Sequence, residues 1–521
     1  MSATPSAASA FAAPSPQLSA DLQQFLDLLE RGKDSAALVH MRKGRLQLES
    51  FVRRQLADAQ TFEQVIARES EQWAEHVAQA QKDNDVRVQQ RYVLPELLSG
   101  LQLVHDIKVG RPGRPDDAVY LKSQFARERL PRGNCIAEWP TQDATCFFPL
   151  VRGYRKFTGQ EDDGELKKRA GDEEEAEQLS RFFTKPQEQS RWVISTTKEN
   201  GEAGHLSVLK RSDGQFVFVL GSKNTHLMAQ TVEDIERTRE AARQGNGGDP
   251  YLAAAPIGTA ILRMLFALEP TKRTLLCEFL WQTRATASFE VLCPDHQHVQ
   301  LLDYLSEDTP VFYGLSLMAY NSLEGAEICV NPVLLYEFMR ALGVRTVVYD
   351  VVEFNVDAFE AALERSKCAY QHEGGVHLFL DEDAAVIGMQ KHKSIWYVCL
   401  RAIREKAKTF CRTLNSKKPP KGRAKPLLPK DALKLAKKAM QKRFQTIPAF
   451  LRISDEVSNA YEALGEQFIE YLFEEELFCG LADGKEQEEK CKHVARDVAD
   501  LFPVVWKRFL EHTGLSDAIG Q

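Results

Sequence analysis

The spacing of apolar residues predicts helices near the start of the chain. Apolar side chains recur there three and four residues apart, and Gly32 follows as a helix stop; they are Leu22, Phe25, Leu26 and Leu29. Thr61 and Gln64 form a predicted capping box at the start of a second long helix. We therefore predict a helical N-terminal region over 19–108. Residues 1–18 are mainly Ala, Ser and Pro, and we expect them to form a disordered tail.

Short apolar runs, typical of strands, begin after residue 109 and alternate with helical segments. The predicted strands are 146–151, 206–209, 216–220, 274–279, 289–292, 311–317, 346–352 and 375–380. The two runs on either side of Ser212-Asp213-Gly214 predict a β-hairpin. Many short strands separated by helices indicate an α+β fold with antiparallel sheets, which we assign to residues 109–405.

The chain becomes helical again after residue 405, so we predict a helical C-terminal domain over 406–521. Helical spacing is present in 431–444, 454–478 and 486–512. The stretch 417–443 holds eleven lysines and arginines and one acidic residue, Asp431. Such a surface suits an RNA backbone, although a solvated linker followed by an ordinary helix would have the same composition.

Composition and charge narrow the class of protein. A length of 521 residues predicts two to four domains, and a net charge of −7 argues against a uniformly basic nucleic-acid coat. Ten cysteines without a C-x-x-C pair indicate reduced thiols. Cys293, His296 and His298 lie close in sequence, but they lack a second ligand pair, so we do not predict a metal site there. No apolar run reaches the length of a membrane span, so we expect a soluble, cytoplasmic protein, with a nuclear location left open.

One motif points to covalent chemistry. Residues 195–202 read Ser-Thr-Thr-Lys-Glu-Asn-Gly-Glu and follow a strand-like run. Covalent nucleotidyltransferases present a lysine nucleophile in this way, with two residues between the lysine and a glycine. The amine of Lys198 would attack the α-phosphate of a nucleotide, and Gly201 would let the backbone approach the ligand. A surface lysine beside a turn glycine is the alternative, because the K-x-x-G pattern alone is common.

Further motifs follow one another across residues 130–405. They are Arg132-Gly133, Arg155-Lys156-Phe157, Lys198-Glu199-Asn200-Gly201, 274–279 with Glu278, Phe312-Tyr313-Gly314-Leu315, His372-Glu373-Gly374-Gly375-Val376 and Lys391-His392-Lys393. In this order they resemble the motifs of ATP-dependent RNA ligases, closest to the phage enzyme that rejoins broken tRNA and the ligase domain of fungal tRNA ligases. The resemblance implies a nucleotidyltransferase (ATP-grasp-like ligase) domain of antiparallel sheets with helices, flanked by the two helical regions.

The resemblance also implies a role for each matched residue. Lys198 would be the nucleophile, with Lys391, Lys393 and Glu373 as further catalytic residues. Because a free lysine has a pKa near 10.4, we expect the two lysines and a metal ion to activate it. Glu373 and Glu278 would hold Mg²⁺ or Mn²⁺, and ATP would be the nucleotide. The nucleotide-binding residues would be Arg132, Lys156, Asn200, Gly201, Lys223, Glu278 and Phe312, with Phe312 stacked on adenine.

The sequence therefore predicts an ATP-dependent RNA ligase for RNA repair, which joins a 5′-phosphate to a 3′-hydroxyl through lysyl-AMP. Its partner would be RNA, including tRNA, with no DNA preference and no membrane. One alternative is a GTP-using capping guanylyltransferase. It is disfavoured because Asn200 stands where capping enzymes usually have aspartate, and because no barrel-like strands follow residue 405. The other alternative is an RNA-binding protein of the same fold without catalysis. We expect the acidic stretch 161–177 to be a solvated insertion.

Overall fold

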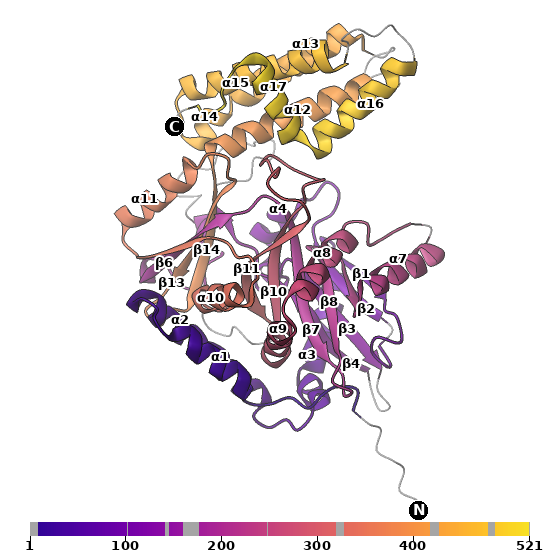
Figure 1. Ribbon diagram of the computed structural model, residues 1–521, viewed down its shortest axis with the longest axis vertical. Helices are drawn as coiled ribbons and strands as arrows, with labels where there is room; N and C mark the ends of the chain where they lie inside the picture. Colours follow the sequence, from indigo (N-terminus) through magenta and orange to yellow (C-terminus); the bar gives the residue numbers. More distant parts are fainter. Residues whose placement is uncertain are drawn as a thin grey trace, which may run out of the picture.

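The computed structural model combines helices with antiparallel sheets, which confirms the predicted α+β class (Figure 1). The structure describes residues 9–101, 103–140, 145–159, 177–246, 248–318, 328–416, 427–477 and 485–519. The predicted acidic insertion therefore lies outside the described residues except for Glu177, and so does 417–426 of the basic stretch.

Three sheets form the body of the molecule. The first has the order β1-β2-β3-β4, with β1 (Val86–Tyr92), β2 (Leu103–Val109), β3 (Asn134–Pro140) and β4 (Thr145–Arg152). The second has the order β11-β10-β7-β8-β9, with β7 (Glu202–Lys210), β8 (Phe216–Ser222), β9 (His226–Ala229), β10 (Ala285–Leu292) and β11 (Thr309–Leu317). The third has the order β12-β6-β13-β14-β5, with β5 (Thr158–Gly159), β6 (Trp192–Lys198), β12 (Tyr349–Glu353), β13 (Gly374–Leu380) and β14 (Val386–Lys393).

All neighbouring strands run antiparallel except β5 and β14, which are parallel. The predicted hairpin is confirmed as β7 and β8. The predicted strands 146–151, 289–292, 311–317 and 375–380 are confirmed as β4, β10, β11 and β13. The strand predicted at 346–352 is observed as β12, which begins at Tyr349.

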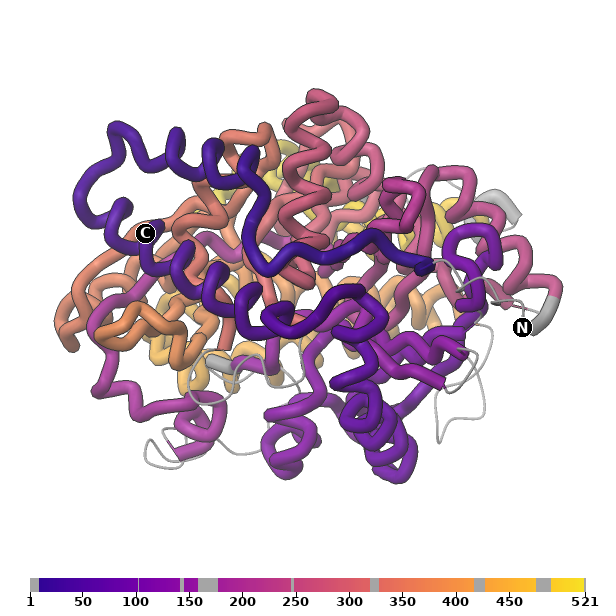
Figure 2. Tube along the Cα trace, turned by 90° about the horizontal axis from the view of Figure 1, so that it is seen from below, coloured from indigo at the N-terminus to yellow at the C-terminus, as the bar shows by residue number. Residues whose placement is uncertain are grey.

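Helices pack over the sheets, and the N-terminal helices lie across one face of the molecule. The N-terminal helices are α1 (Ala20–Glu30), α2 (Ser35–Leu56) and α3 (Phe62–Lys82), and Figure 2 shows them running over the surface seen from below. The capping box of Thr61 and Gln64 is confirmed at the start of α3. The helices among and over the sheets are α4 (Asp116–Lys122), α5 (Gln124–Arg129), α7 (Val232–Asn246), α8 (Ala254–Ala267), α9 (Pro270–Thr283), α10 (Pro332–Leu342) and α11 (Val356–Lys367).

Two expectations for the N-terminal part are wrong. The region 19–108 is not purely helical, because it also contributes β1 and β2 to the first sheet. Part of the predicted tail is ordered, since Phe11 is 2% exposed and packs against Phe62 and Trp139. Backbone hydrogen bonds join Ala10 and Ala12 to the turn between β7 and β8. A single large aromatic side chain in the core is enough to order a segment whose composition predicts disorder.

The C-terminal part is a helical bundle with its own hydrophobic core. It comprises α12 (Ile395–Asn415), α13 (Pro429–Phe444), α14 (Ile447–Leu451), α15 (Asp455–Tyr471), α16 (Lys485–Asp500) and α17 (Phe502–Thr513). The bundle stands at one end of the molecule, beyond the sheets (Figure 1). Its first helix begins at Ile395, inside the range predicted for the ligase domain, because Ser394 caps that helix directly after β14. No helix in the described part of the chain is long and apolar enough to cross a membrane.

Candidate functional site

Lys198 lies in a cavity of about 380 Å³ that is lined by strands of both five-stranded sheets and by α12. The structure brings seven of the predicted site residues to this cavity: Arg132, Lys198, Gly201, Lys223, Glu373, Lys391 and Lys393. These residues come from loops and strands far apart in the sequence, so the fold and not the local sequence assembles them.

The strand register places the three lysines around Gly374. Lys198 at the end of β6 pairs with Gly374 on β13, and Gly374 pairs with Lys393 on β14. Lys391 lies two residues before Lys393, and side chains two apart on a strand point to the same face of the sheet. The sheet therefore aims both lysines of β14 into the cavity that holds Lys198.

Two positions in the site require glycine. A Cβ on Gly201 would lie 2.3 Å from the carbonyl oxygen of Val291, because the turn after Lys198 presses against β10. Gly374 has φ +136, and a Cβ there would lie 2.0 Å from the carbonyl oxygen of His392. A side chain at either position would separate the strands that carry the cavity residues.

Lys198 is held between carboxylates. Its Nζ lies 2.8 Å from Oε1 of Glu373. Burial by itself lowers the pKa of Lys198, but the charges of Glu373 and Glu290 outweigh burial and raise that pKa above its ordinary value. Burial also raises the pKa of Glu290 to about 7, with the Glu373 charge acting in the same direction and Lys198 opposing it. Without ligands, Lys198 is therefore an ammonium ion and not yet a nucleophile.

Glu278 is not part of the site, which corrects the sequence prediction. Residues 274–279 belong to helix α9, and Glu278 pairs with Lys210 and accepts a hydrogen bond from Gln282. The helix is favoured by Pro270 in its first turn and by Glu269, whose side chain caps it. A short, mostly apolar strand and a segment of a buried helix have the same local pattern, so periodicity could not separate them.

The glutamate that reaches the cavity is Glu290 on β10, which sequence reasoning missed. Its Oε1 accepts a hydrogen bond from the backbone N–H of Gly201 at 3.2 Å. The sequence contained a signal for this residue. Glu290 is the charged residue inside the run 285–292, part of which was predicted as a strand, and a charge in an apolar strand needs a partner.

Phe312 is also misassigned. It is fully buried and packs against Phe289 and Tyr336 in the core. The cavity is lined instead by the next residue, Tyr313. The register of β10 and β11 shifts between Ser288 and Phe289, so Tyr313 is the extra residue of a β-bulge. A bulge redirects a side chain, which is why the aromatic residue facing the cavity is Tyr313.

Asn200 is a buried link that does not itself line the cavity. Its side-chain nitrogen donates to Oε2 of Glu373 at 2.9 Å, and its oxygen accepts from the backbone N–H groups of Val299 and Gln300 at 3.1 and 3.3 Å. The amide is suited to this task because it donates and accepts, whereas an aspartate at the same place would only accept. Asn200 therefore orients Glu373 and ties it to the loop at 293–300.

The cations predicted to bind phosphates gather at one end of the site around α4. Arg132 and Lys223 each lie 2.9 Å from Asp116, and Lys156 pairs with Asp117. Lys156 is buried behind this group and does not line the cavity. Burial, followed by the charges of Arg132 and Lys391, lowers the pKa of Lys156 to about 8. Together these residues form a cluster of three cationic side chains held in place by two aspartates.

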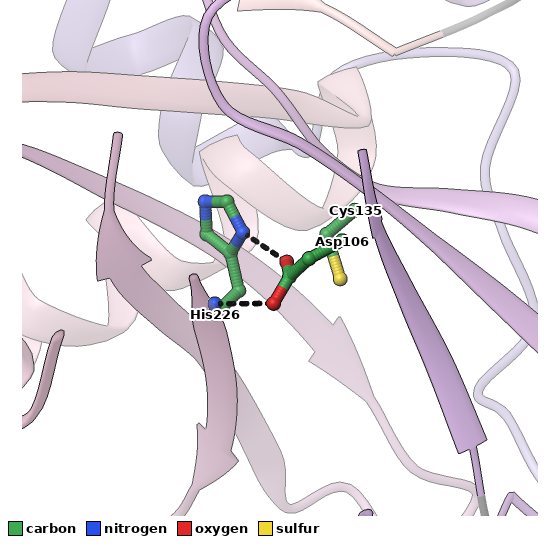
Figure 3. Close-up of side chains that lie close together, drawn as sticks. All are labelled: Asp106, Cys135 and His226. Atoms are coloured by element: carbon green, nitrogen blue, oxygen red, sulfur yellow. Dashed lines mark hydrogen bonds and ion pairs between the residues drawn. The ribbon is translucent and has the colours of Figure 1, made fainter. Parts of the chain in front are cut away.

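His205 on β7 also lines the cavity and was not predicted. Its Nδ1 lies 3.2 Å from the carbonyl oxygen of Ser222 and 3.4 Å from Nε2 of His226. Nδ1 of His226 in turn bonds Asp106 at 2.7 Å, and Figure 3 shows this imidazole and carboxylate facing each other beside Cys135. Because a carbonyl only accepts, this arrangement favours the proton of neutral His205 on Nδ1. Burial lowers the pKa of His205 to about 3, so the residue is neutral.

The helical bundle contributes to the same cavity through α12. Arg401 lines it, and Nζ of Lys393 lies 5.7 Å from the ring centroid of Tyr397 one turn earlier. Oγ of Ser394 donates to the carbonyl of His372 at 2.7 Å, and the N–H of Ser394 donates to the carbonyl of Glu373 at 2.9 Å. These bonds fix the start of α12 beside Glu373.

The site has donors for a divalent cation and for a nucleotide. Glu290 and Glu373 both act on the charge of Lys198, and burial raises the pKa of Glu290 because it removes water from the carboxylate. Paired carboxylates of this kind suit a hard cation such as Mg²⁺ or Mn²⁺. The cations at the other end, Arg132 and Lys223, suit phosphate oxygens.

The chain is similar over part of its length to a protein family and to a solved structure. A protein-family profile described as "Domain of unknown function (DUF7920)" matches residues 178–404, a range that includes Lys198, Glu290, Glu373 and both lysines of β14. No curated protein matches the chain. Among solved structures, the chain is similar to a Naegleria gruberi RNA ligase, a mutant with ATP and Mn, at 12% sequence identity and a TM-score of 0.25. That similarity covers 40% of this chain and 52% of the ligase chain, so this chain spans about half of the protein it matches.

Proposed function

We propose that this protein is an ATP-dependent RNA ligase that joins a 5′-phosphate to a 3′-hydroxyl through an AMP group carried on Lys198. The observation that carries the proposal is the placement of the Lys198 amine in one cavity with carboxylates, among them Glu290 and Glu373, and with six other cationic side chains. The cationic residues are Arg132, Arg155, Lys223, Lys391, Lys393 and Arg401. An amine next to carboxylates and surrounded by phosphate-binding groups has the components that nucleotidyl transfer requires.

The proposed reaction has three displacements at phosphorus. The neutral amine of Lys198 attacks the α-phosphorus of ATP, forming a P–N bond as the bond to pyrophosphate breaks. An oxygen of the RNA 5′-phosphate then attacks that phosphorus and releases the lysine. In the last step the RNA 3′-hydroxyl attacks the activated 5′-phosphate, loses its proton and displaces AMP. Lys391 and Lys393 line the same cavity and would stabilise negative charge at the reacting phosphate.

Lys198 must lose its proton before the first step. A divalent cation held by Glu290 and Glu373 would supply positive charge where the ammonium of Lys198 now balances both carboxylates. Proximity of positive charge lowers the pKa of a lysine. Asn200 contributes by keeping Glu373 in place, because its side chain donates to that carboxylate.

Labelling with ATP tests this function directly. The full chain, incubated with Mg²⁺ and ATP labelled at the α-phosphate, is expected to retain label through a denaturing gel, and peptide mapping is expected to locate it on Lys198. ATP labelled at the γ-phosphate should leave no label, because pyrophosphate departs. Labelling from GTP in place of ATP would favour a capping-type guanylyltransferase. Label on another residue, or none on folded protein, would contradict the proposal.

We also propose that α13 binds the RNA backbone. Four lysines on α13 are exposed and recur every four residues, which places them along one side of the helix: Lys430, Lys434, Lys438 and Lys442. Lys437, by contrast, is engaged with Glu470. A row of exposed lysines on one side of a helix supplies phosphate contacts without sequence readout.

Replacement of Lys434, Lys438 and Lys442 by glutamine is expected to weaken RNA binding and to lower its salt dependence. Three lost phosphate contacts on single-stranded RNA reduce the slope of log K against log salt by about 2. Binding isotherms at several salt concentrations measure this slope. A matched control replaces Arg53, Arg54 and Lys82, which are exposed on the N-terminal helices. Self-adenylation should survive in both triple variants, and an equal slope for both would contradict a role of α13.

A further inference from the structure

Two side-chain clusters in the described part of the chain have the residue types of a metal site. One of them is fully buried, and the other is accessible to an ion from solvent. Asp106, Cys135 and His226 are all at most 1% exposed. The Asp106 carboxylate already accepts from the ring and the backbone N–H of His226 and pairs with Arg91 at 3.4 Å (Figure 3). This cluster is a closed hydrogen-bond network in which every charge is balanced, so it carries no metal proposal.

The second cluster is partly exposed and lies beside the cavity. It consists of Glu202, His296 and His298, whose ligand atoms lie within 4.8 Å of one another. Nε2 of His298 is 3.1 Å from Oε1 of Glu202, and Glu202 also lines the cavity. Ligands of one metal ion at about 2.1 Å lie roughly 3 to 4 Å apart, so only small side-chain rotations would close this set around an ion.

The loop that carries both histidines is held on each side. The N–H of His296 donates to the carbonyl of Cys293 at 3.0 Å, and the N–H of Gln297 donates to the carbonyl of Asp500 at 2.6 Å. Beyond His298, the N–H groups of Val299 and Gln300 both donate to Asn200. A loop fixed in this way keeps its side chains in place before any ligand arrives, which lowers the entropic cost of binding.

His296 has the partner that metal-binding histidines usually have. Its Nδ1 lies 3.5 Å from Oδ1 of Asp500, at the end of α16, so its Nε2 would be the nitrogen that binds the ion. A carboxylate behind a ligating imidazole fixes its orientation and raises its basicity. Two imidazoles and one carboxylate with open positions suit a divalent transition metal, whereas Mg²⁺ prefers oxygen ligands only.

From this geometry we infer that Glu202, His296 and His298 bind a divalent transition-metal ion, of which Zn²⁺ fits the ligand set. The ion would join Glu202, the first residue of β7, to the loop 293–300, and through Asp500 to the helical bundle. The site is separate from the Glu290 and Glu373 pair and does not depend on whether the cavity uses ATP.

Cobalt titration tests this site, because Co²⁺ reports its ligands through visible absorption. The full chain, without an affinity tag and stripped with a chelator, is titrated with Co²⁺ in excess Mg²⁺, which occupies all-oxygen sites. The expected result is a visible absorption band that saturates at one equivalent and is lost when Zn²⁺ is added. His296→Gln and His298→Gln should each weaken binding at least about tenfold, as loss of a ligand or of its support does elsewhere.

His512→Gln is the matched control, since His512 is an exposed histidine on α17 away from the cluster. Its Co²⁺ affinity and stoichiometry should equal those of the parent chain. Absence of a one-equivalent band in the stripped parent would overturn the inference. An unchanged band in both His296→Gln and His298→Gln would also overturn it, because the ion would then lie elsewhere. Circular dichroism of each variant separates loss of the site from loss of the fold.

Discussion

Lys198→Ala is expected to lose joining of 5′-phosphorylated RNA with ATP, by at least about 10⁴-fold, because the amine is the only group proposed to carry AMP. The same variant is expected to seal RNA that already carries a 5′-adenylate. In that last step the RNA hydroxyl is the nucleophile, and the enzyme supplies only alignment and charge stabilisation, which Lys391, Lys393 and Glu290 retain. A gel comparison of the two substrates measures both outcomes.

The chain offers a matched control for this substitution. Lys210 also lies on a strand and also pairs with a glutamate, Glu278, but it does not line the cavity. Lys210→Ala should therefore join both substrates at close to the parental rate. If Lys198→Ala joined phosphorylated RNA as well as Lys210→Ala does, the proposed ligase mechanism would be wrong. If it failed on both substrates while folded, Lys198 would be needed for more than carrying AMP.

Glu290→Gln is expected to reduce self-adenylation by about 10²- to 10³-fold, whereas Glu278→Gln should leave it within a factor of about two. The glutamine at 290 keeps the size of the side chain and removes its charge, so it removes a proposed metal contact and one of the two carboxylates around Lys198. A reduction of this size corresponds to the loss of one electrostatic contact in an enclosed site. Glu278 is paired with Lys210 on another part of the surface and has no such contact.

Initial rates of label incorporation at several Mg²⁺ concentrations measure this difference. Loss of a metal contact should raise the Mg²⁺ concentration needed for half-maximal rate in Glu290→Gln, and that readout separates a metal role from a purely structural one. Thermal unfolding of both variants checks that the fold persists. A large defect in Glu278→Gln with a normal Glu290→Gln would restore the original sequence assignment and contradict the geometry of the cavity.

Local motifs predicted only part of the residue set around Lys198. Lys198, Gly201, Glu373, Lys391 and Lys393 lie at the ends of short apolar strands, where alternation shows which side chains share a face. Their assignment came from the resemblance of the motifs, in their order, to those of RNA ligases, and the antiparallel register brings Lys198 and Lys393 together around Gly374. The α+β class could be predicted for the same reason, because strand and helix periodicities differ over most of the chain.

The sequence could not show which of two similar residues reaches the cavity. Phe312 and Tyr313 are both aromatic and both lie on β11, and a β-bulge decides that Tyr313 faces the cavity while Phe312 enters the core. Glu278 and Glu290 each stand in an apolar run. Pro270 and the Glu269 cap favour a helix for the first run, and pairing of β10 with β7 and β11 made the second a strand. The strand pairing depends on contacts made after the chain has folded.

The remaining groups of the site are brought together by long-range contacts. Cys293, His296 and His298 lacked enough ligands as a local motif, and Glu202, the third member of the proposed site with His296 and His298, comes from a strand more than ninety residues earlier in the chain. Arg401 comes from α12 of the C-terminal bundle, which begins at Ile395, although the sequence placed that segment in the ligase domain. A sequence motif shows which residues share one face of a strand or helix. Burial of apolar surface decides which of these faces pack together, and it brings together segments that are distant in the sequence.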